Sequence, residues 1–202
     1  MDLIVKIIAL VFAVVIHEVA HGYAAYLLGD PTAKRAHRLT LNPLVHLDLF
    51  GSVILPLVLV FAGSPVLLGW AKPVPFNPRY FRDPRRGIMI VGAAGPVTNF
   101  LAALVSAVLF RLVGPVVPLL AHFLFFFCAT NLILGIFNLI PIPPLDGSRI
   151  VLGILPDDLV PAYLRLESFG FIIIFALLWL GVLDYVIFPI FHFLLGWLLS
   201  PG

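Results

Sequence analysis

Residues 3–28 read LIVKIIALVFAVVIHEVAHGYAAYLL, an almost unbroken apolar run that contains His17-Glu18-Val19-Ala20-His21. A spanning helix needs about 20 apolar residues, so this run predicts a helix that crosses a membrane. Two histidines four residues apart lie on one face of a helix, so both imidazoles can reach one metal ion. The glutamate between them can contact a water bound to that metal. The run therefore predicts a zinc hydrolase site inside a membrane.

The composition excludes a water-soluble fold. Of the 202 residues, 62% are hydrophobic and only 11% are charged, against about 25% charged residues in a soluble domain. We expect one integral membrane domain over residues 1–202, with a core at 3–150 and a C-terminal spanning segment at 168–199. The chain has no phosphate-binding glycine loop, and its basic residues do not form a nucleic-acid footprint, so nucleic acid is not an expected partner.

Four further apolar runs follow the first. They are Leu49–Trp70, interrupted by Pro56 and by Gly63-Ser64-Pro65, then Gly87–Val113, Val116–Ile140 and Ser168–Leu199, with a kink or break expected at Pro189. Ile150–Leu166 mixes charged and apolar residues and predicts an amphipathic surface helix. The expected fold is an all-α polytopic membrane protein with about four spanning helices, a re-entrant or interfacial hairpin and this surface helix.

The basic residues predict the orientation. Eight of the twelve Lys and Arg side chains fall in residues 30–48 and 72–86. Cytoplasmic loops carry an excess of Lys and Arg, so both segments are expected on the cytoplasmic side of a cell membrane, with the N-terminus outside. Leu49–Trp70 then does not cross once: it enters and returns as a broken hairpin, or it lies in the interface. The end of the fourth apolar run returns to the leaflet of His21, which places the active site towards the cytoplasmic side.

Asp146 is the candidate for a third zinc ligand. Hydrolytic zinc sites commonly have three protein ligands and one open position for water, and His17 and His21 supply two ligands. The prolines at 141, 143 and 144 prevent a regular helix, so the Asp146 carboxylate can be aimed inward. The alternative is an aspartate that caps the following helix. Glu18 is the expected general base, which takes a proton from the water and passes it to the leaving amine.

Three asparagines and one further histidine are weaker candidates. Asn99 and Asn138 are candidates for hydrogen bonds to the substrate backbone or to the oxyanion of the tetrahedral intermediate, and interhelical hydrogen bonding is the alternative for both. For Asn131 the interhelical role is favoured. His46 could line the site or bind a second metal ion, and an interfacial histidine is the favoured interpretation.

Three motifs follow one another along the chain: His-Glu-Val-Ala-His at 17–21, Gly-Pro-Val-Thr-Asn at 95–99, and Asn-Leu-Ile-Pro-Ile-Pro-Pro-Leu-Asp-Gly at 138–147. Together they resemble the site-2 protease family of intramembrane zinc metalloproteases. Residues 69–77, Gly-Trp-Ala-Lys-Pro-Val-Pro-Phe-Asn, look like a compact prokaryotic subgroup. The resemblance implies roles for six side chains: ligation of one Zn²⁺ by His17, His21 and Asp146, activation of water by Glu18, and contacts with substrate or intermediate by Asn99 and Asn138.

We therefore expect an intramembrane zinc metalloprotease that hydrolyses peptide bonds in or near transmembrane segments of membrane-protein substrates. The expected partners are a substrate with a transmembrane helix and the lipid bilayer. The alternative is a non-catalytic metal-binding membrane protein or a metal transporter, which would need the histidines but not Glu18. Because a helical substrate hides its carbonyl groups, it must unwind, and segment 49–70 is expected to offer an edge to the extended peptide.

Overall fold

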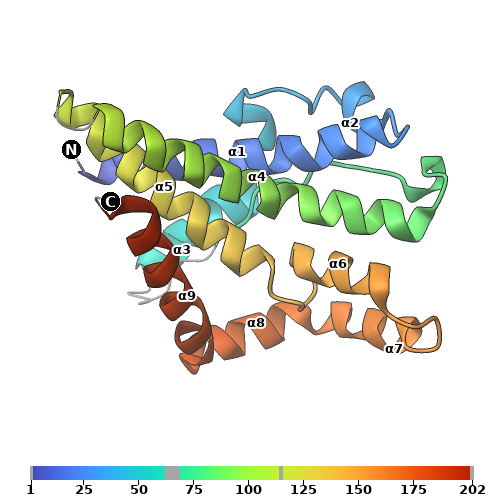
Figure 1. Cartoon of the computed structure of the whole chain (residues 1–202). Coiled ribbons are helices and arrows are strands. Elements are labelled where there is room, and N and C mark those ends of the chain that lie inside the picture. Colours follow the sequence, from blue (N-terminus) through green and yellow to red (C-terminus); the bar gives the residue numbers. More distant parts are fainter. Residues whose placement is uncertain (1, 62–68, 114–115, 201–202) are drawn as a thin grey trace.

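The structure, a computed structural model, describes residues 2–61, 69–113 and 116–200. Every regular element in these ranges is helical (Figure 1). Four helices are long and apolar enough to cross a membrane: α1 (Asp2–Leu27), α4 (Pro84–Val113), α5 (Pro118–Asn138) and α9 (Val182–Leu199). The expected all-α polytopic membrane fold with about four spanning helices is confirmed.

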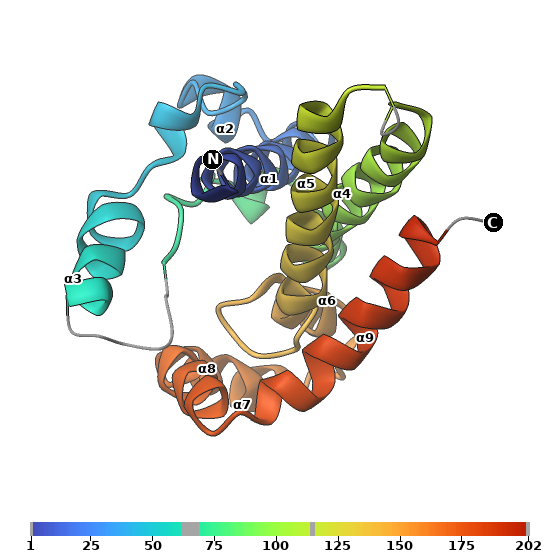
Figure 2. The same ribbon diagram turned by 90° about the vertical axis from the view of Figure 1, so that its left-hand side faces the viewer.

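Helix α4 packs against α1, α5 and α6 (Asp146–Ile154), and Figure 2 shows α9 on the far side of α5 from α1. The main core lies between α4, α5 and α9. It contains small buried side chains such as Ala103, Ala107 and Cys128, with Leu132 and Phe191 beside them. Lipid tails give helices no hydrophobic reason to associate, so close approach through small residues provides the packing. This core therefore fixes α4 relative to α5 and α9.

The two ends of the segment Leu49–Trp70 meet. The segment begins with the π-helical turn η2 (Leu49–Ile54) and the seven-residue helix α3 (Leu55–Phe61), which is too short to span a bilayer. Trp70 N donates to Gly51 O at 3.2 Å, and Ser52 Oγ donates to Trp70 O at 2.8 Å. The expected break at Gly63-Ser64-Pro65 lies outside the described residues. The segment thus returns to the level at which it starts, as the sequence predicts.

The two basic segments contact each other at one end of the bundle. They carry three short helices, α2 (Thr32–Arg35), η1 (Pro43–His46) and η3 (Pro78–Tyr80). Asn77 N donates to Asp30 Oδ2 at 2.6 Å, and Arg38 Nη2 donates to Lys72 O at 2.5 Å. Residues 30–48 and 72–86 therefore lie at the same end of the bundle.

The expected surface helix Ile150–Leu166 is wrong in one respect, because it is two helices. Helix α6 ends at Ile154, and α7 covers Val160–Arg165. Leu155 has an extended backbone with ψ of 143°, which is the conformation that a following proline imposes. Pro156 thus divides the two helices.

Of the kink or break expected at Pro189, the break is wrong. Pro189 lies inside α9, whereas the chain breaks at Gly181, whose left-handed φ of 68° follows the end of α8 (Gly170–Trp179). Only glycine adopts this conformation without cost, whereas an isolated proline in a spanning helix is tolerated. The turn η4 (Leu166–Ser168) joins α7 to α8 with a bend of 67°. The C-terminal spanning segment is therefore α9, and α8 precedes it as a separate helix.

Candidate active site

His17 and His21 project from the second half of α1 in the same direction. Both are buried, their Nε2 atoms lie 3.0 Å apart, and their rings are nearly perpendicular. Helix α4 passes beside them at Gly95, where a methyl group would lie 2.5 Å from His17 Cε1 and 2.5 Å from His21 Nε2. The lack of a side chain at this position is what lets α4 pack over the two imidazoles.

The carboxylate of Asp146 completes a group of three. Asp146 begins α6, and its Oδ2 lies 3.0 Å from Nε2 of His17 and 3.0 Å from Nε2 of His21. Gly147 permits this placement, since a methyl group there would lie 2.2 Å from the carbonyl oxygen of Leu139. The start of α6 thus packs directly against the end of α5, and the three side chains named from the sequence are buried together.

The other ring nitrogen of each histidine has an acceptor. His17 Nδ1 lies 2.5 Å from Asn99 Oδ1, and His21 Nδ1 lies 2.7 Å from the carbonyl oxygen of Val91. Both acceptors require the proton on Nδ1, so each Nε2 presents a lone pair towards Asp146. Metal-ligating histidines are oriented in the same manner, by a hydrogen bond from the ring nitrogen that does not bind the metal.

The three residues fit a zinc ion. Asp146 Oδ2 is buried and receives no hydrogen bond from the described residues, and two imidazole lone pairs face it. The Arg149 guanidinium lies 2.9 Å from Asp146 Oδ1, and this ion pair favours the ionised form of Asp146. A buried carboxylate and two unprotonated nitrogens at 3.0 Å need a cation between them. Two nitrogens and one oxygen suit zinc and leave one position open.

Glu18 is held from outside α1. Its Oε2 accepts a hydrogen bond from Val74 N at 2.9 Å. Val74 belongs to residues 69–77, which we call the strap. The strap packs closely on α1, since a methyl group at Gly22 would lie 2.7 Å from Val74 Cγ1. Glu18 thus follows His17 directly on α1, and the strap contacts its carboxylate.

Three contacts anchor the strap. Lys72 N donates to His46 O at 2.9 Å, Lys72 O accepts from Arg38, and Asn77 N donates to Asp30 Oδ2. Asp30 is fully buried. A charged residue is rarely buried to this extent unless it is paired, and the Asn77 N–H is one of its partners. His46 is buried as well, with Nε2 2.9 Å from Thr40 O, and it does not belong to the group formed by His17, His21 and Asp146. A role for His46 in a second metal site stays a prediction.

Asn99 contacts His17 at Nδ1, whereas Asp146 lies at the other ring nitrogen, Nε2. It is fully buried, and its Nδ2 donates to Asn131 Oδ1 at 2.7 Å while its Oδ1 faces His17. In this arrangement neither end of the amide faces a substrate, and the contacts favour a role in orienting His17. Asn131 continues the chain by donating to Phe127 O at 2.8 Å. Asn138 Nδ2 donates to Leu134 O, so its expected substrate contact stays a prediction.

Arg149 and the Val91 carbonyl make contacts with the proposed zinc ligands that the motifs did not predict. Arg149 Nη1 donates to Asp146 Oδ1 at 2.9 Å and thereby fixes the carboxylate, with the guanidinium carbon 5.4 Å from the ring centre of Phe76. The spacing of Asp146 and Arg149, three residues apart at the start of a helix, was a usable signal. The contact between His21 and the Val91 carbonyl has no signal in the sequence, because every residue type carries that group.

The comparisons with known proteins agree with this geometry. The family model "Peptidase family M50" matches residues 116–181. YwhC of Bacillus subtilis, whose name places it among the zinc metalloproteases, is 38% identical over 194 residues, which cover 92% of this chain and 85% of YwhC. Rip2 of Mycolicibacterium smegmatis, named in the same way, is 30% identical over 171 residues, which cover 81% of this chain and 62% of Rip2. No solved structure gave a significant match. The chain therefore belongs to peptidase family M50 and is an intramembrane zinc metalloprotease.

Proposed function

We propose that His17, His21 and Asp146 hold the zinc ion and that Glu18 is the general base. The observation that carries this assignment is the convergence of three buried ligand atoms within 4.8 Å of one another. Glu18 directly follows the first of these residues in the sequence. Among the described residues no other group of His, Cys, Asp and Glu has this arrangement. The proposed substrate is a membrane protein cut in or near a transmembrane helix.

Each residue of the site has a distinct role in the proposed hydrolysis. Zinc, when bound, polarises the scissile carbonyl and activates a water molecule. Glu18 takes the proton from that water and later gives it to the leaving amine. The Val74 N–H binds Oε2, so the carboxylate does not rotate freely, and Oε1 remains as the second basic oxygen. Asn99 and the Val91 carbonyl hold the two imidazoles, and Arg149 holds the Asp146 carboxylate.

The strap also suggests how an unwound substrate is bound. Trp70, Lys72 and Val74 donate alternate N–H groups towards the neighbouring loop and Glu18, which is the pattern of an extended chain. Its other edge then offers the Ala71 N–H and the carbonyls of Ala71, Pro73 and Pro75. Such an edge can accept a peptide as an added strand. An Ala71→Pro variant removes the last N–H of this edge and is expected to slow cleavage without loss of zinc. Unchanged cleavage would exclude this docking mode.

The basic segments support an orientation with the active site towards the cytoplasm and the N-terminus outside. Both segments meet at the end of α1 that lies nearer His21, so the site and the positive charge occupy the same half of the bundle. Labelling of cysteines introduced singly at Arg79 and Asp2 in a Cys128→Ala background, in intact cells and in inverted vesicles, tests this. We expect Arg79→Cys to react only in inverted vesicles and Asp2→Cys only in intact cells, and the reverse pattern would contradict the proposal.

Glu18→Gln separates the protease from a metal carrier. The amide keeps the acceptor for Val74 N–H but cannot take a proton. We expect the variant to bind one zinc ion as tightly as the parent and to lose cleavage of a transmembrane substrate by at least about 100-fold, the usual contribution of a general base. A metal transporter that does not use Glu18 would lose neither zinc nor transport. Full cleavage by Glu18→Gln would remove the proposed mechanism.

A further inference from the structure

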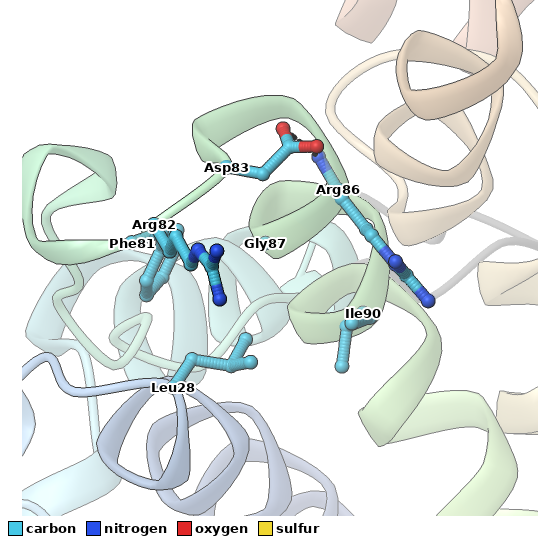
Figure 3. A pocket seen from close by; sticks show the side chains of 7 residues that line it. All are labelled: Leu28, Phe81, Arg82, Asp83, Arg86, Gly87 and Ile90. Carbon is cyan, nitrogen blue, oxygen red and sulfur yellow. Dashed lines mark hydrogen bonds between the residues drawn. The ribbon is translucent and has the colours of Figure 1, made fainter.

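A cavity lies outside the candidate active site, where α4 begins (Figure 3). It has a volume of about 510 Å³, within the range of about 300–1,000 Å³ that is typical of small-molecule sites. Leu28, Phe81 and Ile90 line its apolar side, and Arg82 and Arg86 bring guanidinium groups to it. We call it the arginine pocket. None of its lining residues belongs to the active site described above.

The apolar side of the arginine pocket is firmly built. Phe81 is 5% exposed and packs with Ala25 and Val91, both fully buried. Gly87 permits this packing, since a methyl group there would lie 2.2 Å from Phe81 Cδ2. The wall is therefore fixed by contacts between α1 and α4 and does not depend on a ligand to form.

The two arginines of the pocket are uncommitted. Arg82 and Arg86 are exposed, and neither guanidinium makes a hydrogen bond or ion pair with the residues that the structure describes. Arg85, their neighbour, is different: it donates to Leu152 O at 2.8 Å and pairs with Asp157. The third charged group of the pocket is Asp83, whose Oδ1 accepts from the backbone N–H of Arg85 and of Arg86 at 3.1 Å each.

The charge of the pocket suits a monoanion. Arg82 and Arg86 contribute +2 and Asp83 contributes −1, which leaves +1. The Asp83 carboxylate caps the first turn of α4, so it is partly neutralised by the helix itself. A phosphodiester carries one negative charge and accepts hydrogen bonds from guanidinium groups in a fork geometry.

The pocket lies at the depth of lipid headgroups. Leu28 follows the last residue of α1 and Pro84 begins α4, and both helices are candidate spans. The two helices have 26 and 30 residues, more than the roughly 20 that cross the hydrocarbon core, so their ends reach the headgroup layer. A ligand here meets cations on the water side and Leu28, Phe81 and Ile90 on the other. Basic pockets between spanning helices at this level suit anionic lipid headgroups.

We propose that the arginine pocket binds the phosphodiester headgroup of an anionic phospholipid such as phosphatidylglycerol, with the start of an acyl chain against its apolar side. Val91 belongs to the packed wall, and its carbonyl is the acceptor for His21. A bound lipid would therefore brace the turn of α4 that orients a proposed zinc ligand.

Native mass spectrometry of the full chain in detergent tests the proposal. The protein is titrated with dioleoyl-phosphatidylglycerol, with dioleoyl-phosphatidylcholine, and with glycerophosphoglycerol, the soluble phosphodiester of the same headgroup. We expect one phosphatidylglycerol to bind in preference to phosphatidylcholine and not to be displaced by glycerophosphoglycerol. Equal retention of both lipids, or displacement by the soluble phosphate, would overturn the proposal.

Matched variants locate the binding. Arg82→Gln/Arg86→Gln should weaken phosphatidylglycerol binding roughly 25-fold, about fivefold for each guanidinium near the membrane surface. Arg79→Gln removes one positive charge from the same segment outside the pocket and should leave binding unchanged, whereas either pocket arginine replaced alone should cost about fivefold. Asp83→Asn keeps a good helix cap but removes the opposing charge, so it should bind about fivefold more tightly. Equal losses in Arg79→Gln and in the double variant, or weaker binding by Asp83→Asn, would contradict the assignment.

Discussion

The backbone N–H of Val74 donates to Glu18 Oε2 at 2.9 Å, and this hydrogen bond joins the strap to α1. Glu18 follows His17 on α1, so its Cα position is set by the helix. The direction of its carboxylate, in contrast, is set by the strap. The proposed base therefore depends on contacts at the ends of the strap as well as on its own helix.

Asp30 is expected to act on catalysis through the strap. Its buried carboxylate accepts from Thr32 N at 2.9 Å, from Thr32 Oγ1, and from Asn77 N at 2.6 Å. Asp30→Asn leaves one acceptor oxygen in place of two, and a hydrogen bond to a charged group is worth about 1.5–3 kcal/mol. If that energy holds the strap in place, kcat for a transmembrane substrate should fall about 10- to 100-fold. Zinc content, measured in parallel, should stay at one ion per chain.

Asp157→Asn is the control for Asp30→Asn. It removes the same charge from an exposed carboxylate that pairs with Arg85, away from the strap. Its cleavage rate should match that of the parent. A loss of zinc in Asp30→Asn, or parental activity in that variant, would show that the strap does not position Glu18.

Gly95→Ala tests the close approach of α4 to the two histidines. Its methyl group would lie 2.5 Å from atoms of both imidazoles, so the rings or the helix must move. We expect loss of zinc and of cleavage, although alanine is favoured over glycine inside a helix by up to about 1 kcal/mol. Gly196→Ala in α9 is the matched variant, because nothing lies within 4 Å of its methyl position. It should be as active as the parent, and zinc binding by Gly95→Ala at parental affinity would refute the packing described here.

Arg149→Gln should weaken zinc binding without abolishing it. Arg149 touches Asp146 Oδ1, not the oxygen that faces the histidines. Residues of this kind commonly contribute 10- to 100-fold to metal affinity. Competition with a chromophoric chelator measures the loss, and Arg149→Lys should recover part of it because one donor remains. Equal zinc affinity in the parent and in Arg149→Gln would show that the carboxylate needs no such support.

Asn99→Ala and Asn99→Asp separate the two roles of Asn99. If Asn99 orients His17, the alanine variant should lose zinc affinity about 10-fold or more, and the aspartate variant should keep it because an acceptor remains for Nδ1. If Asn99 bound the substrate, both variants would keep zinc and raise KM. Chelator competition and steady-state kinetics on the same preparations decide between the two outcomes.

Much of the zinc site could be predicted from the sequence because its signals are local. His17 and His21 share a helix face by their spacing alone, and the proline-rich stretch before Asp146 marks a turn that can aim a carboxylate inward. The return of segment 49–70 followed from the positions of the basic residues. The break near the C-terminus did not, because proline is the stronger local signal in a soluble helix, whereas the membrane tolerates Pro189 and Gly181 takes the left-handed turn.

The partners of these residues could not be predicted. The orientation of His21 depends on a backbone carbonyl of α4, and that of Glu18 depends on a backbone N–H of the strap. Nearly every residue type carries the same main-chain N–H and C=O groups, so the sequence does not show which of them will make a contact. Asn99 was visible as a polar residue in an apolar helix, but whether its amide faces His17 or a substrate is a matter of helix rotation, which packing decides.

Ligation of one zinc ion by His17, His21 and Asp146 is best tested by X-ray absorption at the zinc edge of the purified full chain. We expect one zinc ion with two imidazole nitrogens and with carboxylate and water oxygens at about 2.0–2.2 Å. The carboxylate oxygen should be lost in Asp146→Ala but not in His46→Ala. A zinc environment without two imidazoles, or one that Asp146→Ala leaves unchanged, would contradict it.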